Sequence, residues 1–286
     1  MNIWTNWKFR YEKEEIQKWT SLQKTAYLLF PLLVYLLVHD AVEILLMALL
    51  ELAVNANSGM WQFFMKHATV LQPILSSLAI MAAVLAIRKA FKWELEAKET
   101  KKARGDASKV TTYAFFAGIA FLSAVGINIL FYQLGITAQS ENFQKVQEAQ
   151  YGVHFLIGLI LYGLISPFAE EAVFRGILYN RMKRCFGVRI ALFVSALLFG
   201  CYHGNFVQAL YGFILGVLIA YSYEFSKDFC VPVLFHSVAN ISVYVLTYHK
   251  GLNSLKKGTA ITAAIFMLAL AVAFGGYLHR QKEKEV

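Results

Sequence analysis

The stretch S-P-F-A-E-E-A-V-F-R, residues 166–175, lies inside a long apolar segment and places Glu170, Glu171 and Arg175 there. Ionisable side chains are costly at membrane depth, so where they occur they usually serve a function. Residues four apart share a helix face, so Glu171 and Arg175 can form an ion pair, whereas Glu170 is turned by about 100° from Glu171. The stretch therefore predicts one paired carboxylate and a second one available for chemistry.

The composition of the whole chain supports a membrane setting. Its 286 residues are 58% hydrophobic and 16% charged, and the mean hydropathy is +0.51, which is typical of a polytopic membrane protein. The net charge of +9 flanks apolar segments and forms no basic stripe, so it indicates membrane orientation and not nucleic-acid binding. The three cysteines are far apart, which predicts neither disulfides nor a zinc knuckle.

Segments of about 20 apolar residues can cross the hydrocarbon core of a bilayer. The fold predicted on this criterion is an all-α, polytopic transmembrane helical bundle of about eight spans. Proline removes a helical hydrogen bond, so we expect the fourth span to kink or to restart at Pro167 with Ser166 as its cap. The spans are expected near residues 26–50, 68–87, 110–134, 152–180, 190–204, 206–223, 230–248 and 258–278.

An even number of spans places both termini on the same side of the membrane. With cytoplasmic termini, 21 of the 27 Lys and Arg residues fall in cytoplasmic segments and five in outer loops. This bias follows the positive-inside rule and predicts that both termini are cytoplasmic. The hydrophilic segment from Arg88 to Lys109 is expected to be a cytoplasmic loop with a solvated charged face near the lipid headgroups.

Two later spans carry polar residues at helical spacing. Phe199 and His203 are four apart in F-G-C-Y-H, and His236 and Asn240 are four apart in H-S-V-A-N, so each pair is expected on one helix face. A rise of about 1.5 Å per residue places Glu170 and both histidines at depths of roughly 10 to 20 Å. These three side chains could therefore meet inside the membrane.

Taken in order, E-E-x-x-x-R at 170–175, F-x-x-x-H at 199–203 and H-x-x-x-N at 236–240 resemble the motif set of the CPBP family. This family is also called Abi or type II CAAX proteases and includes the Rce1-like enzymes. The resemblance covers about residues 150–245 and implies an intramembrane endopeptidase. The segment Y-G-F-I-L-G at 211–216 is similar to the family's glycine-rich sixth span, and its small residues would permit close helix approach.

The resemblance leads us to expect four regions along the chain. Residues 1–25 are expected to form an amphipathic cytoplasmic lead-in, and residues 26–150 the amino-terminal transmembrane spans. Residues 151–248 are expected to be the CPBP/Abi-like catalytic core, and residues 249–286 the last span with a basic cytoplasmic tail.

Peptide hydrolysis requires a water to be deprotonated, an oxyanion to be stabilised and a leaving amine to be protonated. Glu170 is the candidate general base, and His203 could position the same water or shuttle its proton. His236 and Asn240 are potential donors on one face and could hold the oxyanion. Glu171, opposite the arginine, is expected to stay ionised and structural. The resemblance implies the same roles.

A metal site is an alternative for the same residues. Glu170, His203 and His236 would form a His2Glu set, which is a known ligand type for catalytic zinc. The chain lacks H-E-x-x-H, but ligands drawn from three helices need no local motif. Members of the family have been described both as metalloproteases and as glutamate-dependent enzymes. We favour water activation without a metal, keep Zn as the alternative, and expect no other cofactor.

The expected activity is hydrolysis of a peptide bond in a membrane-associated substrate, either a prenylated CAAX tail or a bacterial peptide precursor. The partners expected are membrane lipid and a membrane-anchored or prenylated peptide or protein, without nucleic acid, and the oligomeric state is left open. The resemblance suggests a multi-pass protein of a bacterial or archaeal plasma membrane. Two alternatives stay open: a non-catalytic scaffold or bacteriocin-immunity protein of the same fold, and a proton-coupled transporter.

The first span contains a second polar group, formed by His39, Asp40 and Glu43 at about mid-membrane. His39 and Glu43 are four residues apart and can face each other across one helical turn. The family motifs do not include this span. We therefore expect a structural or substrate-gating network and not a part of the chemistry.

Overall fold

The computed structural model describes residues 7, 9, 11–56, 58–96, 106–254 and 256–284. Over these residues the protein is helical, with no β-strand. The predicted polytopic helical bundle is confirmed, and the predicted fifth span, Val188–Tyr202, is a shorter apolar helix of 15 residues. Seven helices are long and apolar enough to cross a membrane: Ser21–Asn55, Gly59–Glu96, Lys109–Gln133, Phe155–Phe186, Phe206–Ser226, Cys230–Tyr248 and Lys257–Gln281.

The chain forms two compact units, and each draws on two separate parts of the sequence. Unit 1 comprises Met1–Lys98 and Gly152–Ala191, and unit 2 comprises Glu99–Tyr151 and Leu192–Val286. The four regions expected from the sequence stay a prediction, as do the cytoplasmic termini. Of the expected lead-in, residues 1–6, 8 and 10 lie outside the described residues.

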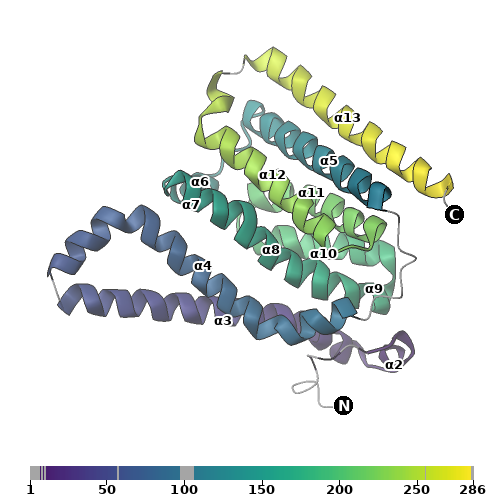
Figure 1. Ribbon diagram of the computed structural model, residues 1–286, viewed down its shortest axis with the longest axis horizontal. Helices are drawn as coiled ribbons and strands as arrows, with labels where there is room; N and C mark the ends of the chain where they lie inside the picture. Colours follow the sequence, from purple (N-terminus) through teal and green to yellow (C-terminus); the bar gives the residue numbers. More distant parts are fainter. Residues whose placement is uncertain are drawn as a thin grey trace. The chain divides into compact units, whose positions relative to one another are not determined.

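A long helical hairpin forms the first part of unit 1. The short helix α2 (Lys13–Gln17) precedes α3 (Ser21–Ala56) and α4 (Ser58–Glu96), which pack against each other. Figure 1 shows that α4 bends along its length. α3 contains Pro31 and α4 contains Pro73.

α4 continues to Glu96 and α5 begins at Asp106, so the loop predicted from Arg88 to Lys109 is wrong for residues 88–96 and 106–109; residues 97–105 lie outside the described residues. Ile87, Ala90 and Glu94 are buried, and their spacing of three and four residues is that of one helix face. The basic residues between them lie on the exposed face. The charged stretch from Arg88 to Glu96 is therefore the amphipathic last part of α4.

A continuous helical segment, Phe155–Phe186, forms the second part of unit 1. Its hydrogen-bond spacing changes along its length, because η1 and η2 are π-helical whereas the flanking parts are α-helical. Its parts are α7 (Phe155–Ile160), η1 (Leu161–Ile165), α8 (Ser166–Glu171), η2 (Ala172–Tyr179) and α9 (Asn180–Phe186). We call this segment the site helix.

The predicted restart at Pro167 is wrong. Ser166 has helical dihedral angles, φ −60° and ψ −49°, so it is not a cap, and the helix continues through Pro167. The physical reason is the π-helical turn that precedes the proline. The amide of Ser166 donates to the Leu161 carbonyl, five residues earlier, which is π-helical spacing, so Pro167 follows directly on a π-helical turn.

Unit 2 is built around α5 (Asp106–Gln133), which packs against α11 (Phe206–Ser226), α12 (Cys230–Tyr248) and α13 (Lys257–Lys284). α5, α12 and α13 run side by side in Figure 1. The unit also contains most of α10 (Val188–Tyr202) and the short elements α6 (Glu141–Tyr151) and η3 (Gly251–Ser254). Its core is apolar and takes residues from these helices, among them Phe116, Ile119, Ile219 and Phe235.

Candidate functional site

The first part of the candidate site is a buried ion pair on the site helix. Arg175 Nη1 lies 3.0 Å from Glu171 Oε1, and both side chains are 0% exposed. This confirms the ion pair that the spacing predicted. Glu170 is half-buried, and its charge also acts on Arg175. Two carboxyl groups and one guanidinium group thus lie within six residues of an apolar helix.

The π-helical element η2 packs against α4 at Gly176, the residue after Arg175. A Cβ atom at Gly176 would lie 2.5 Å from ring atoms Cδ2 and Cε2 of Phe91, so only glycine fits against this ring. Asn180 Nδ2 donates a hydrogen bond to the Gly176 carbonyl at 2.9 Å. Phe168, which lies in α8, makes an edge contact with the same Phe91 ring. α4 thus supports the site helix directly beside its charged residues.

The second part of the candidate site groups both histidines around one aromatic ring in unit 2. The ring centroid of Phe199 lies 5.0 Å from that of His203 and 5.5 Å from that of His236, with edge-on geometry in both cases. Phe199 and His236 are buried, and Asn240 follows one turn later on α12 with intermediate exposure. The F-x-x-x-H and H-x-x-x-N motifs therefore meet in the fold.

His203 does not lie on the helix, as was predicted, but in the turn that follows α10, which ends at Tyr202. It still stays close to Phe199, because His203 Nδ1 lies 2.9 Å from the Phe199 carbonyl oxygen. The turn contains Gly204 with φ +72°, a left-handed conformation that favours glycine.

Asn205 holds this turn and begins the next helix. Its Oδ1 accepts a hydrogen bond from the Gln208 amide at 2.9 Å, which caps α11, and its Nδ2 donates to the His203 carbonyl at 3.4 Å. The sequence analysis missed Asn205. The signal was present, because Asn before an apolar run with Gln three residues later is typical of a helix start.

Glycines bring α10 and α11 into close contact, as the glycine-rich sixth span predicted. A Cβ at Gly200 would lie 2.5 Å from the Ala209 carbonyl oxygen, and one at Gly212 would lie 3.3 Å from the Gly200 Cα. At Gly216 a Cβ would lie 3.1 Å from ring atom Cδ1 of Phe199. The helix contact that these glycines permit therefore places the Phe199 ring.

The six predicted site residues divide between the two units. Glu170, Glu171 and Arg175 belong to unit 1, whereas His203, His236 and Asn240 belong to unit 2. Among the described residues, no group of three or more His, Cys, Asp or Glu side chains is arranged to hold a metal ion. We therefore derive no chemical step through zinc, and the His2Glu set stays a hypothesis.

The predicted polar group of the first span is a network that joins the two hairpin helices. His39 Nδ1 lies 2.9 Å from Asp40 Oδ1 and 4.0 Å from Glu43 Oε2. Ser76 of α4 donates a hydrogen bond to Glu43 Oε1 at 2.9 Å. This link between α3 and α4 fits the expected structural role.

Comparison with known proteins agrees with the motif pattern. The sequence model of the family described as "Type II CAAX prenyl endopeptidase Rce1-like" matches residues 152–242, a segment that contains all six predicted site residues. The chain is 25% identical over 193 residues to "Putative membrane peptidase YdiL" of Bacillus subtilis (strain 168), covering 68% of this chain and 78% of that protein.

It is also 28% identical over 194 residues to "Membrane-embedded CAAX protease MroQ" of Staphylococcus aureus (strain USA300), covering 65% of this chain and 75% of the relative. No solved structure matches the chain.

Proposed function

We propose that this chain, which carries an Rce1-like CAAX protease domain at residues 152–242, is an endopeptidase that hydrolyses a peptide bond of a membrane-associated substrate. The observation that carries the proposal is that the segment matched by the family model contains two groups, a buried Glu171–Arg175 ion pair beside Glu170, and two histidines on one aromatic ring. A single family segment contains both groups, and each supplies one part of the chemistry that peptide hydrolysis needs.

Glu170 is proposed as the general base. Its neighbour Glu171 forms the ion pair with Arg175, and Glu170 is the second carboxyl group at this position. Glu170 takes a proton from water as the water oxygen bonds to the carbonyl carbon and the carbonyl electron pair moves to oxygen. When the C–N bond breaks, Glu170 returns this proton to the leaving nitrogen, and the products are an amine and a carboxylic acid that keeps the second proton of the water.

The histidines and Asn240 are proposed to act on the water and on the oxyanion. A proton on His203 Nδ1, donated to the Phe199 carbonyl, leaves Nε2 as an acceptor for the attacking water. His236 and Asn240 lie one turn apart on α12 and can both donate to the oxyanion. Because α12 is a packed helix, these donors need little rearrangement during the reaction.

The substrate is proposed to carry its own membrane anchor. Glu170 and His236 lie on apolar helices that are long enough to span a bilayer, so a peptide attached to a lipid or a hydrophobic segment is already held at the enzyme. A prenylated CAAX tail and a bacterial peptide precursor both meet this requirement. We expect the anchored form of a peptide to be cleaved at a lower concentration than the same peptide without its anchor.

Purified protein in lipid nanodiscs provides the test, with a fluorogenic prenylated peptide and an unprenylated leader peptide as substrates. Wild type should cleave at least one peptide, Glu170→Gln should abolish cleavage, and Glu148→Gln, an exposed glutamate of α6, should not change it. Cleavage by folded Glu170→Gln at the wild-type rate would overturn the proposed mechanism.

Three further measurements decide between the alternatives. Cleavage that persists with a strong chelator supports water activation without a metal, whereas a loss that added zinc restores supports the His2Glu alternative. Two results together would favour a non-catalytic scaffold. The folded wild-type protein would be inactive on both peptides, and the Glu170→Gln variant would complement a cellular phenotype as well as wild type does. Proton-dependent uptake into liposomes would favour a transporter.

A further inference from the structure

Each helix of the α3–α4 hairpin contains a buried proline, Pro31 in α3 and Pro73 in α4. Proline has no amide hydrogen, so the carbonyl four residues earlier loses its helical donor. The two carbonyls released in this way belong to Tyr27 and Thr69. The Tyr27 carbonyl accepts a hydrogen bond from Arg181, in the last part of the site helix. The Thr69 carbonyl accepts one from His154, the residue directly before the site helix.

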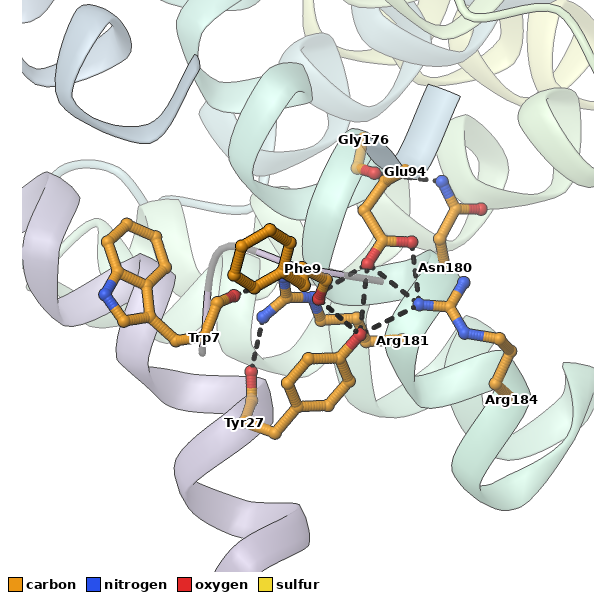
Figure 2. Close-up of polar contacts among 8 residues, drawn as sticks. All are labelled: Trp7, Phe9, Tyr27, Glu94, Gly176, Asn180, Arg181 and Arg184. Atoms are coloured by element: carbon orange, nitrogen blue, oxygen red, sulfur yellow. Dashed lines mark hydrogen bonds and ion pairs between the residues drawn. The ribbon is translucent and has the colours of Figure 1, made fainter. Parts of the chain in front are cut away.

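Arg181 of α9 occupies the carbonyl released by Pro31. Its Nη1 donates to the Tyr27 carbonyl at 2.7 Å, its Nη2 to the Trp7 carbonyl at 2.7 Å, and its Nε to Glu94 Oε1 at 2.9 Å. The guanidinium carbon lies 3.9 Å from the centroid of the Tyr27 ring, and the side chain is 0% exposed. Figure 2 shows these contacts converging on Arg181.

The charge balance around Arg181 makes its carbonyl contacts important. Arg184 Nη2 lies 2.7 Å from Glu94 Oε2, so two buried or partly buried arginines share one carboxylate. The excess positive charge needs further acceptors when it is removed from water. The carbonyls of Tyr27 and Trp7 supply them. Both arginines lie in α9, six and nine residues after Arg175.

The opposite end of the site helix uses the carbonyl released by Pro73. The amide of His154, the residue before α7, donates to the Thr69 carbonyl at 3.1 Å. Amides at the start of a helix have no partner within that helix. The proline-released acceptor and this unpaired donor therefore satisfy each other, and the site helix is joined to α4 at this end.

Glu170, Glu171 and Arg175 lie on the site helix between these two anchors. Glu170 and Glu171 end α8, and Arg175 lies in the π-helical η2. The direction in which each side chain points depends on the hydrogen-bond spacing of the whole segment, because the change from α- to π-spacing alters the rotation per residue. Fixing both ends fixes this rotation at the glutamates.

We propose that Pro31 and Pro73 are positioning residues, which orient Glu170 by releasing the carbonyls of Tyr27 and Thr69 for the two ends of the site helix. This inference rests on the proposed function for its effect on catalysis. Its structural part, the anchoring of His154 by the Thr69 carbonyl, can be measured without any substrate.

The test compares Pro31→Ala and Pro73→Ala with Leu33→Ala and Ile74→Ala, two exposed neighbours on the same helices. Alanine restores the amide that competes for the released carbonyl. Each proline variant should lower kcat on the cleaved peptide by roughly tenfold to a hundredfold, with little change in KM, because a small misplacement of a catalytic group has effects of this size. The two control variants should match wild type.

Hydrogen exchange gives the second measurement. The peptide around His154 should exchange faster in Pro73→Ala than in wild type, and at the wild-type rate in Ile74→Ala. Unchanged exchange at His154, or proline variants with the kcat of their controls, would overturn the proposal. Faster exchange in a protein whose wild type cleaves no peptide would instead retain the anchoring and reject the proposed function.

Discussion

At the scale of single residues, the two adjacent glutamates should differ in what they do for stability. Glu171 makes the 3.0 Å bond to the fully buried Arg175. Removing one partner of a buried ion pair leaves an uncompensated charge, which costs about 3–5 kcal/mol. We expect Glu171→Gln to lower the thermal unfolding temperature in detergent well below that of Glu170→Gln. Equal unfolding temperatures would contradict this assignment of the ion pair.

The aromatic ring between the histidines gives a second residue-scale prediction. Phe199→Leu retains an apolar side chain in α10 but removes the ring edge and face that contact His203 and His236. We expect cleavage to fall at least about tenfold, a loss of about 1.4 kcal/mol in transition-state stabilisation. Phe193→Leu is the matched control, because Phe193 lies on the same helix and is 57% exposed. A similar rate for both variants would refute a role for the Phe199 ring.

Residue spacing within one helix was enough to predict the Glu171–Arg175 pair, because the contact depends only on local helical geometry. The Arg181 contacts could not be predicted in this way. Its acceptors include the main-chain carbonyls of Tyr27 and Trp7, which have no sequence signature and are brought close only by tertiary packing. Glu94 was not predicted as a partner of these arginines either. It lies in a stretch whose exposed face is basic, which made the stretch resemble a solvated loop.

At the scale of helices, the contact between α10 and α11 should depend on Gly200. A Cβ there would lie 2.5 Å from a backbone oxygen, which cannot move without moving α11. Gly200→Ala should therefore lower the free energy of unfolding by about 1–3 kcal/mol. Gly275→Ala in α13 is the matched control, because nothing lies within 4 Å of its Cβ position. Denaturant unfolding should show no loss for this control, and an equally stable Gly200→Ala would argue against close helix packing.

The motifs predicted which helices matter but not their hydrogen-bond spacing. The sequence of the site helix suggested a break at Pro167, whereas η1 carries the helix through it. A π-helical turn has no reliable residue signature, because its cost is repaid by contacts elsewhere in the fold. His203 was likewise assigned to a helix that ends one residue earlier. Helix ends and period changes thus depend on packing that spacing does not encode.

At the scale of the whole molecule, the distribution of basic residues makes a prediction about membrane orientation. Both termini should be cytoplasmic, because 21 of the 27 Lys and Arg residues then fall on that side. Reporter fusions in a bacterial host measure this: a reporter active only in the cytoplasm should function at both ends of the chain. Activity of a reporter that functions only outside the membrane, fused at either end, would contradict the predicted topology.

The proposed mechanism also requires residues of both units to act on one substrate. Glu170 and His236 belong to different units. Because the proposed mechanism needs both residues at one peptide bond, cysteines at these two positions should be joined by a short thiol-reactive cross-linker. The three native cysteines are first replaced by serine. A cysteine at Leu164 paired with the same partner is the control, because Leu164 is on the site helix but 51% exposed. Mass spectrometry should detect the first cross-link and not the second. Cross-linking of the control pair alone would contradict the shared site, since water activated by Glu170 must reach the oxyanion donors within hydrogen-bond distance.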